Sequence, residues 1–379
     1  MTNNHRLLHI DVWRFFAIAL VIVCHLIEFS HPFYKTALPG LVWRAHTLGR
    51  LGVELFFCIS GYVICRGMMR ETAVRGALNM RGFYVRRAFR ILPPLFLYGL
   101  VLAALAAAGL IAMEAAQFAR STVFVCNVGA LGDCGWFLGH TWSLAYEEQF
   151  YLVFPLLFAM LAMARQRARL LALTLALAGV AVATCLLGLT GSAHYLAYFT
   201  YMTWGCLYAL YQDELEPVLQ RLPLPVWLGL AFALLARNLV AMPALFTDVL
   251  YPVLAPLAIC AVIFGTPLRQ PLVGALFSQR RLIYLGQISY TLYLWQQLAT
   301  ADHGFASPLW APVLVGFVFV LAHLSFTYFE SPLIRIGSAL SARWSQVQPK
   351  KPAAAPVYGI AGDMTGGAEL HGGHQIQAH

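Results

Sequence analysis

One apolar stretch near the N-terminus carries an arginine and a histidine at a spacing that lets both serve one reaction. Arg14 and His25 lie eleven residues apart in IDVWRFFAIALVIVCHLIE. On a helix this spacing places both on one face, about 16 Å apart along the axis. Asp11 is placed to pair with Arg14 and Glu28 to orient His25, because each lies one turn away. The alternative is that Arg14 and His25 only anchor the helix at its two membrane interfaces.

A second motif, FYVRRAFRILPPL, places Arg87 and Arg90 one turn apart, with Arg86 beside them. Guanidinium groups bind phosphates through paired hydrogen bonds, so the motif predicts a cradle for a phosphorylated cosubstrate arriving from the cytoplasm. Pro93 and Pro94 are expected to fix the backbone where the chain enters the membrane. The alternative is that the arginines only anchor the protein at its cytoplasmic face.

A third motif, HTWSLAYEEQFYLVFPL, carries a carboxylate inside an apolar segment. Ser143, Glu147 and Tyr151 follow at i, i+4 and i+8 and therefore share one helix face. An unpaired carboxylate is costly in the membrane, so Glu147 needs a partner for either a catalytic or a purely structural role. Its candidate partners are Arg14, Arg87 and His25.

Polar and small residues also interrupt other apolar stretches. In LGVELFFCISGYVIC, Gly52 and Gly61 are expected to let helices approach closely, and Ser60 is a candidate supporting residue of the site. Glu54 is either an interfacial carboxylate or a functional group. Later polar residues are expected to form interhelical hydrogen bonds; they are Ser289, Gln296, Gln297, Ser325 and Glu330.

The composition indicates the environment of these motifs. The chain has 379 residues, of which 60% are hydrophobic and 11% charged, whereas a soluble domain carries about 25% charged residues. This is therefore predicted to be an integral membrane protein. The net charge of +9 fits the distribution of basic residues across a bilayer, and no nucleic-acid partner is expected.

Apolar runs of spanning length predict an all-α protein with ten transmembrane helices. An N-terminus inside the cell places about twenty of the 25 basic residues on the cytoplasmic side, so both termini are expected there, with the protein in the inner membrane. The membrane domain is expected to cover residues 1–340 and a disordered cytoplasmic tail residues 341–379. The ten runs are 8–28, 51–68, 91–113, 141–163, 169–190, 194–211, 224–241, 247–265, 283–301 and 308–330.

Two of the eight cysteines differ from the rest. Cys126 and Cys134 flank a polar, glycine-containing loop that the topology places outside, where they could form a disulfide. The others fall in apolar runs and are expected to be core side chains. No cysteine or histidine spacing indicates zinc, so no metal site is expected.

Taken together, these motifs resemble those of the membrane-bound acyltransferase 3 family, which O-acylates sugars and other hydroxyl compounds. The resemblance covers residues 8 to 335, with five blocks in the family's order. The blocks are Arg14 with His25; Gly52, Val53, Phe56, Phe57, Ser60 and Gly61; Arg87, Arg90 and Pro93; Trp142, Ser143, Leu144, Glu147, Phe150 and Tyr151; and the late LGQISYTLYLW and FESP segments.

The resemblance implies acyl transfer from a cytoplasmic acyl-CoA, acetyl-CoA foremost, with His25 as the key catalytic residue and Arg87 and Arg90 near the CoA. Gln296 stands where many members have histidine, so no role is carried to that position. No long soluble domain is expected after the tenth helix, so the esterase-type domain fused to some relatives is expected to be absent.

The leading hypothesis is an O-acetyltransferase that modifies a sugar hydroxyl of an envelope or exported glycan, free or lipid-linked. His25 serves as general base or transient acyl acceptor, Arg14 stabilises negative charge, and Glu28 or Glu147 sets the imidazole tautomer. One alternative is acylation of a small metabolite by the same chemistry. Another is a transporter of lipid or glycan, for which intramembrane charges would serve as a relay. The sequence leaves the oligomeric state open.

Overall fold

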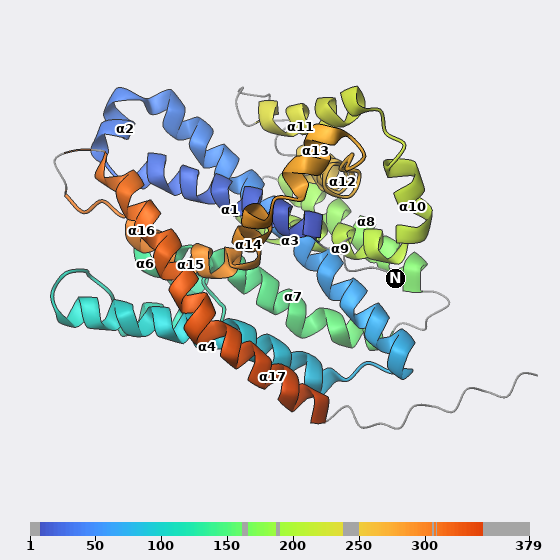
Figure 1. Ribbon diagram of the computed structural model, residues 1–379, viewed down its shortest axis with the longest axis horizontal. Helices are drawn as coiled ribbons and strands as arrows, with labels where there is room; N and C mark the ends of the chain where they lie inside the picture. Colours follow the sequence, from blue (N-terminus) through green and yellow to red (C-terminus); the bar gives the residue numbers. More distant parts are fainter. Residues whose placement is uncertain are drawn as a thin grey trace, which may run out of the picture. The chain divides into compact units, whose positions relative to one another are not determined.

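Helices make up every regular element in the part of the chain that the computed structural model describes, residues 8–160, 166–186, 190–237, 250–304, 307 and 309–343. The all-α prediction is thus confirmed for these residues (Figure 1). In chain order the elements are α1 Leu8–Phe29, α2 Pro32–Ala37, α3 Pro39–Arg75, α4 Met80–Ala107, α5 Ala115–Thr122, η1 Gly129–Leu131, α6 Gly135–Gly139, α7 Thr141–Met160, α8 Gln166–Leu186, α9 Thr190–Leu210, α10 Gln212–Leu219, α11 Leu224–Arg237, α12 Tyr251–Phe264, α13 Pro271–Phe277, α14 Arg280–Gln287, α15 Ser289–Ala299, α16 Trp310–Leu324, the π-helical η4 Ser325–Glu330 and α17 Ser331–Arg343.

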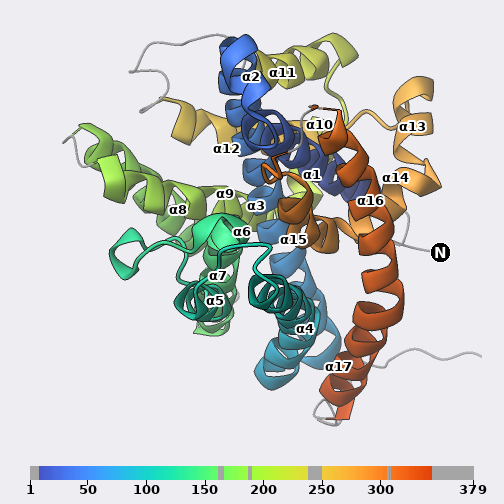
Figure 2. The ribbon, with the colours of Figure 1, turned by 90° about the vertical axis from the view of Figure 1, so that its left-hand side faces the viewer.

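Helix α3 is the central element and is much longer than the predicted run 51–68. It contains 37 residues, begins with Pro39 in its first turn and ends at Arg75, and the capping residue Gly76 has a φ of 78°, which suits glycine. Polar helical turns extend the helix at both ends of the apolar run. A prediction from hydropathy alone does not detect these turns. Helix α3 packs against α1, α7, α9 and α12. Figure 2 shows α1, α3 and α15 lying between the α8–α9 pair and the long α16–α17 rod.

Helix α4 starts earlier than expected. It begins at Met80, where the Asn79 side chain accepts a hydrogen bond from the Gly82 amide at 2.9 Å. Pro93 and Pro94 therefore lie inside the helix, and their place at the membrane entry stays a prediction. The earlier start matters for the site, because Arg87 and Arg90, which precede the predicted run 91–113, project from a regular helix.

The predicted run 283–301 is two helices. Helix α14 ends at Gln287, Ile288 adopts φ −89° and ψ 10°, and α15 begins at Ser289. Helix α14 lies against α1, where a Cβ added to Gly286 would lie 1.7 Å from the carbonyl oxygen of Asp11. The expected continuous helix is therefore broken at Ile288 into α14 and α15.

Four of the described helices are long and apolar enough to cross a membrane. A fifth is added if the bent pair α10 and α11, at 104° to each other, is counted as one span. The protein is thus a multi-pass membrane protein by these helices, while the count of ten spans and the cytoplasmic termini stay predictions. Helix α17 continues past the predicted boundary at residue 340 to Arg343, and the predicted tail from residue 344 lies outside the described residues. The four helices are α1, α3, α4 and the continuous rod Trp310–Arg343.

The predicted cysteine pair is confirmed, because Cys126 and Cys134 form a disulfide with a Cα–Cα distance of 5.7 Å. It closes the loop between α5 and α6. The free cysteines among the described residues are buried, as expected for core side chains; they are Cys24, Cys58, Cys65, Cys206 and Cys260.

Two glycines let α3 contact its neighbours backbone to backbone, as predicted. A Cβ added to Gly52 would lie 2.5 Å from the carbonyl oxygen of Ala17 in α1. A Cβ added to Gly61 would lie 1.9 Å from the carbonyl oxygen of Met202 in α9. Both obstacles are backbone atoms, so neither helix pair can accept a larger side chain without separating.

We predict that Gly61→Ala lowers the melting temperature of the purified protein in detergent, because overpacking of a tight contact costs about 1–3 kcal/mol. Gly67→Ala is the matched control, since nothing lies within 4 Å of a Cβ at that position of the same helix. Thermal unfolding followed by tryptophan fluorescence measures both. Equal melting temperatures for the two variants would contradict the assigned α3–α9 contact.

Candidate active site

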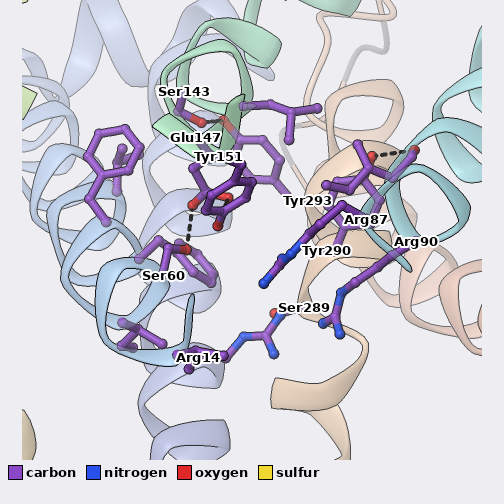
Figure 3. Close-up of a pocket in the computed structure, with 17 residues that line it drawn as sticks. Arg14, Ser60, Arg87, Arg90, Ser143, Glu147, Tyr151, Ser289, Tyr290 and Tyr293 are labelled. Carbon is purple, nitrogen blue, oxygen red and sulfur yellow. Dashed lines mark hydrogen bonds between the residues drawn. The ribbon is translucent and has the colours of Figure 1, made fainter. Parts of the chain in front are cut away.

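Three arginines from two helices line one cavity, here called the arginine cavity. Arg14 comes from α1, and Arg87 and Arg90 come from α4. The cavity holds about 910 Å³ of space free of protein atoms, its open mouth included. Figure 3 shows the three guanidinium groups directed into this space. Arg14 also forms the predicted pair with Asp11, at 3.8 Å. Such a cavity attracts phosphate groups.

Arg86, the third arginine of the same motif, has a different role. Its guanidinium pairs with Glu71 at 2.7 Å and donates a hydrogen bond to the Ser341 hydroxyl. These contacts join α4 to α3 and α17. Arg86 therefore holds the ends of three helices together, and the motif divides into one structural and two cavity-lining residues.

A polar group from α3 and α7 forms the opposite wall of the arginine cavity. The Ser60 hydroxyl donates a hydrogen bond to Glu147 Oε1 at 2.8 Å, and the Tyr151 hydroxyl donates one to Glu147 Oε2 at 3.2 Å (Figure 3). The Arg87 guanidinium lies over the Tyr151 ring, 4.5 Å from its centroid. Glu147 thus has the partners that its position requires, and they are two hydroxyl groups rather than His25.

His25 lines a second, neighbouring cavity, here called the histidine cavity. Its other walls come from α3, the α6 region and α15 and include His46, Arg50, Trp136 and His140. The imidazole packs edge-on against Trp136 at 6.0 Å between centroids. The structure therefore separates His25 from Arg14, although both project from α1.

Two residues, Val53 and Tyr293, line both cavities and form the partition between them. The Tyr293 hydroxyl donates its proton to the His140 carbonyl oxygen at 2.5 Å. Ser143 in turn donates to the Tyr293 oxygen at 2.7 Å, because the tyrosine proton is already used. The predicted residue Ser143 thus supports the partition from the arginine cavity.

The two carboxylates predicted to orient His25 do not hydrogen-bond to it. Glu28 binds the His46 imidazole at 3.0 Å instead, and Glu147 lies in the arginine cavity. Within the described segments, the hydrogen-bond partner of the imidazole is Gln296, whose Oε1 lies 3.0 Å from His25 Nδ1. This position is the one where the sequence departs from the family pattern. Glu54, the other candidate carboxylate, is buried and accepts a hydrogen bond from the Tyr251 hydroxyl at 2.7 Å.

Ser289 and His140 are among the polar cavity residues that were not singled out as site residues from the sequence. Ser289 lines the arginine cavity, and its hydroxyl is buried without a hydrogen-bond partner in the described structure. His140 lines the histidine cavity, and neither of its ring nitrogens has a partner among the described residues. Ser289 was expected to bond to another helix, and its hydroxyl makes no such bond in the described structure. His140 lies two residues before Trp142 of the WSL block, and this nearness was the available signal.

The described helices are those of a multi-pass membrane protein, and its cationic cavity adjoins a second cavity that contains His25. Comparison with known families identifies it further. The acyltransferase domain family, acyltransferase 3, matches residues 7–329, and the chain belongs to this family.

Individual relatives are similar over most of this chain. One is named "Putative peptidoglycan O-acetyltransferase YrhL" of Bacillus subtilis and is 28% identical over 371 residues, covering 88% of this chain and 56% of the relative. Another, the peptidoglycan O-acetyltransferase OatA of Listeria monocytogenes, is 26% identical over 331 residues, covering 76% of this chain and 52% of the relative. The chain thus spans about half the length of the curated relatives it matches. No solved structure matches the chain.

We predict that inorganic pyrophosphate raises the melting temperature of the protein in detergent, because a ligand that binds only the folded state stabilises it by mass action. Arg87→Gln and Arg90→Gln each lose most of this shift, since each removes a cation from the cavity. Arg281→Gln, which removes an exposed arginine of α14, keeps it. Sodium chloride at equal ionic strength is the salt control. An equal shift in all three variants would refute specific binding in the arginine cavity.

Proposed function

We propose that this enzyme transfers an acetyl group from acetyl-CoA to a hydroxyl of an envelope or exported glycan, with His25 at the reacting centre. The observation that carries the proposal is the pair of adjoining cavities, one cationic and one containing His25. The relatives support the acetyl group and the glycan, because their names describe them as peptidoglycan O-acetyltransferases.

The arginine cavity is the proposed donor site. The CoA phosphates bind Arg87 and Arg90 from the cytoplasmic side of the inner membrane, and the pantetheine arm extends past Arg14 toward the partition. The rise along α1 from Arg14 to His25 is about 16 Å, which such an arm can span. Ser289 supplies a further donor to the phosphates, because its hydroxyl is buried, unpartnered and directed at the same cavity.

The histidine cavity is the proposed acceptor site. Ligand sites combine aromatic walls with a few placed polar groups. In this cavity the ring centroids of Phe29 and Trp136 lie 4.4 Å apart. The polar groups beside them are Glu28, Arg50 and His140. The aromatic faces support the ring of a sugar, and the polar groups bind its hydroxyls. A lipid-linked sugar reaches the same cavity from the bilayer.

The reaction at His25 follows one of two balanced routes. In the first, the imidazole takes the proton of the acceptor hydroxyl, the oxygen attacks the thioester carbonyl carbon, and the C–S bond breaks. The CoA thiolate then recovers the proton. In the second, the imidazole attacks first, forms an N-acetyl bond and expels the thiolate. The acceptor oxygen then attacks the acetyl carbon, the C–N bond breaks to regenerate the imidazole, and the hydroxyl proton passes to the thiolate. Arg14 stabilises negative charge on the donor side in both routes.

We predict that membranes containing the wild-type protein transfer labelled acetyl from acetyl-CoA to endogenous glycan, and that His25→Ala lowers the rate by at least about 100-fold. Protein amounts are matched by immunoblot, and folding is checked by the melting temperature. Full activity in His25→Ala would refute the proposed mechanism. Wild-type protein that modifies only small metabolites would refute the glycan acceptor, and wild-type protein without acetyl transfer would refute the reaction.

The donor site gives a separate prediction. Ser289→Ala raises the KM for acetyl-CoA by about 10- to 150-fold with kcat preserved, which corresponds to the loss of one hydrogen bond to a charged group. Ser338→Ala is the control, because Ser338 lies exposed on α17 and its hydroxyl bonds only to its own helix at Ile334. A KM unchanged by Ser289→Ala would remove Ser289 from the donor site.

A further inference from the structure

A chain of hydrogen bonds connects His25 to a backbone carbonyl on the other side of its cavity. His25 Nδ1 lies 3.0 Å from Gln296 Oε1. Gln296 Nε2 donates to Gln297 Oε1 at 3.0 Å, and Gln297 Nε2 donates to the Trp136 carbonyl oxygen at 3.0 Å. Both glutamines are buried, with 0% and 2% exposure, so water does not compete for these bonds.

The carbonyl oxygen at the end of the chain determines the direction of every bond. A backbone carbonyl only accepts, so the Gln297 amide must turn its nitrogen toward Trp136 and its oxygen toward Gln296. Gln296 must then turn its nitrogen toward Gln297 and its oxygen toward His25.

An amide oxygen facing Nδ1 requires that Nδ1 carry the hydrogen. A neutral imidazole has one N–H and one lone pair, so the lone pair is then on Nε2. The partners of a catalytic histidine often determine its tautomer in this way. Both routes of acetyl transfer need that lone pair, either to take the hydroxyl proton or to attack the thioester.

We infer that Gln296 and Gln297 are positioning residues that hold His25 in its Nδ1–H tautomer and make Nε2 the reacting nitrogen. This inference rests on the proposed function of His25. It assigns a function to Gln296, the position at which the chain departs from the family pattern. A glutamine side chain performs this function without an ionisable group. The carboxylates near the cavity are not required, because Glu28 binds His46 instead.

The test compares kcat and KM for acetyl-CoA among matched variants in membranes. Gln296→Leu removes the oxygen at Nδ1 and lowers kcat about 10- to 100-fold, as expected for loss of a residue that orients a functional histidine. Its KM for acetyl-CoA stays at the wild-type value, because the donor site is in the other cavity. Gln296→Glu keeps an oxygen at Nδ1 and restores kcat to within about 5-fold of wild type, since either form of the carboxyl group can accept from Nδ1–H.

Gln297→Leu extends the test to the residue that orients the Gln296 amide. It lowers kcat less than Gln296→Leu, because the Gln296 amide remains beside His25. Gln149→Leu is the control, since it removes an amide that bonds to Asn127 and Phe124 away from His25.

Wild-type kcat in Gln296→Leu, or equal losses in Gln296→Leu and Gln296→Glu, would overturn the inference. If His25→Ala is inactive in the same assay, either result refutes only the tautomer assignment. Full activity in His25→Ala refutes the proposed function itself.

Discussion

The cost of holding cations inside an apolar protein constrains the whole structure. Moving one arginine to the centre of a membrane helix costs about 2.5–3.5 kcal/mol on insertion scales, and this protein directs three toward one cavity. Their mutual repulsion adds to that cost. The guanidinium groups must therefore be held by the packing of the helices around them and by the polar wall that Glu147 forms with Ser60 and Tyr151.

Close packing of α3 supplies this support. Gly52 brings α3 against α1, which carries Arg14, and Gly61 brings it against α9. The same helix contributes Ser60 to the arginine cavity and Arg50 to the histidine cavity. Because α3 contacts both cavities, its position sets the width of each, and small residues on it are as important to the site as the charged ones.

Local spacing in the sequence predicted the parts of the site that lie on single helices. The pairing of Asp11 with Arg14, the shared face of Arg87 and Arg90 on α4, and the shared face of Ser143, Glu147 and Tyr151 on α7 follow from helical periodicity. The division into two cavities does not, because it depends on Tyr293, which meets His140 across 153 residues of chain.

Contacts between residues far apart in the sequence also explain where the structure differs from the other predictions. Gln296 reaches His25 across 271 residues, so no local pattern could replace the carboxylates first expected there. The end of α14 at Gln287 and the polar extension of α3 to Pro39 and Arg75 arise from packing and helix propagation that hydropathy does not measure. Long, strongly apolar segments such as α1 were predicted nearly to the residue.

The partition at Val53 and Tyr293 affects how the two substrates enter and the two products leave. Under the proposed function, CoA and the glycan occupy separate compartments, and only the two-carbon acetyl unit passes between them. Neither carrier has to leave before the other can enter, and each product departs through the opening by which its substrate arrived. The protein then transfers only the acetyl group across the partition, while CoA stays in the arginine cavity and the glycan stays in the histidine cavity.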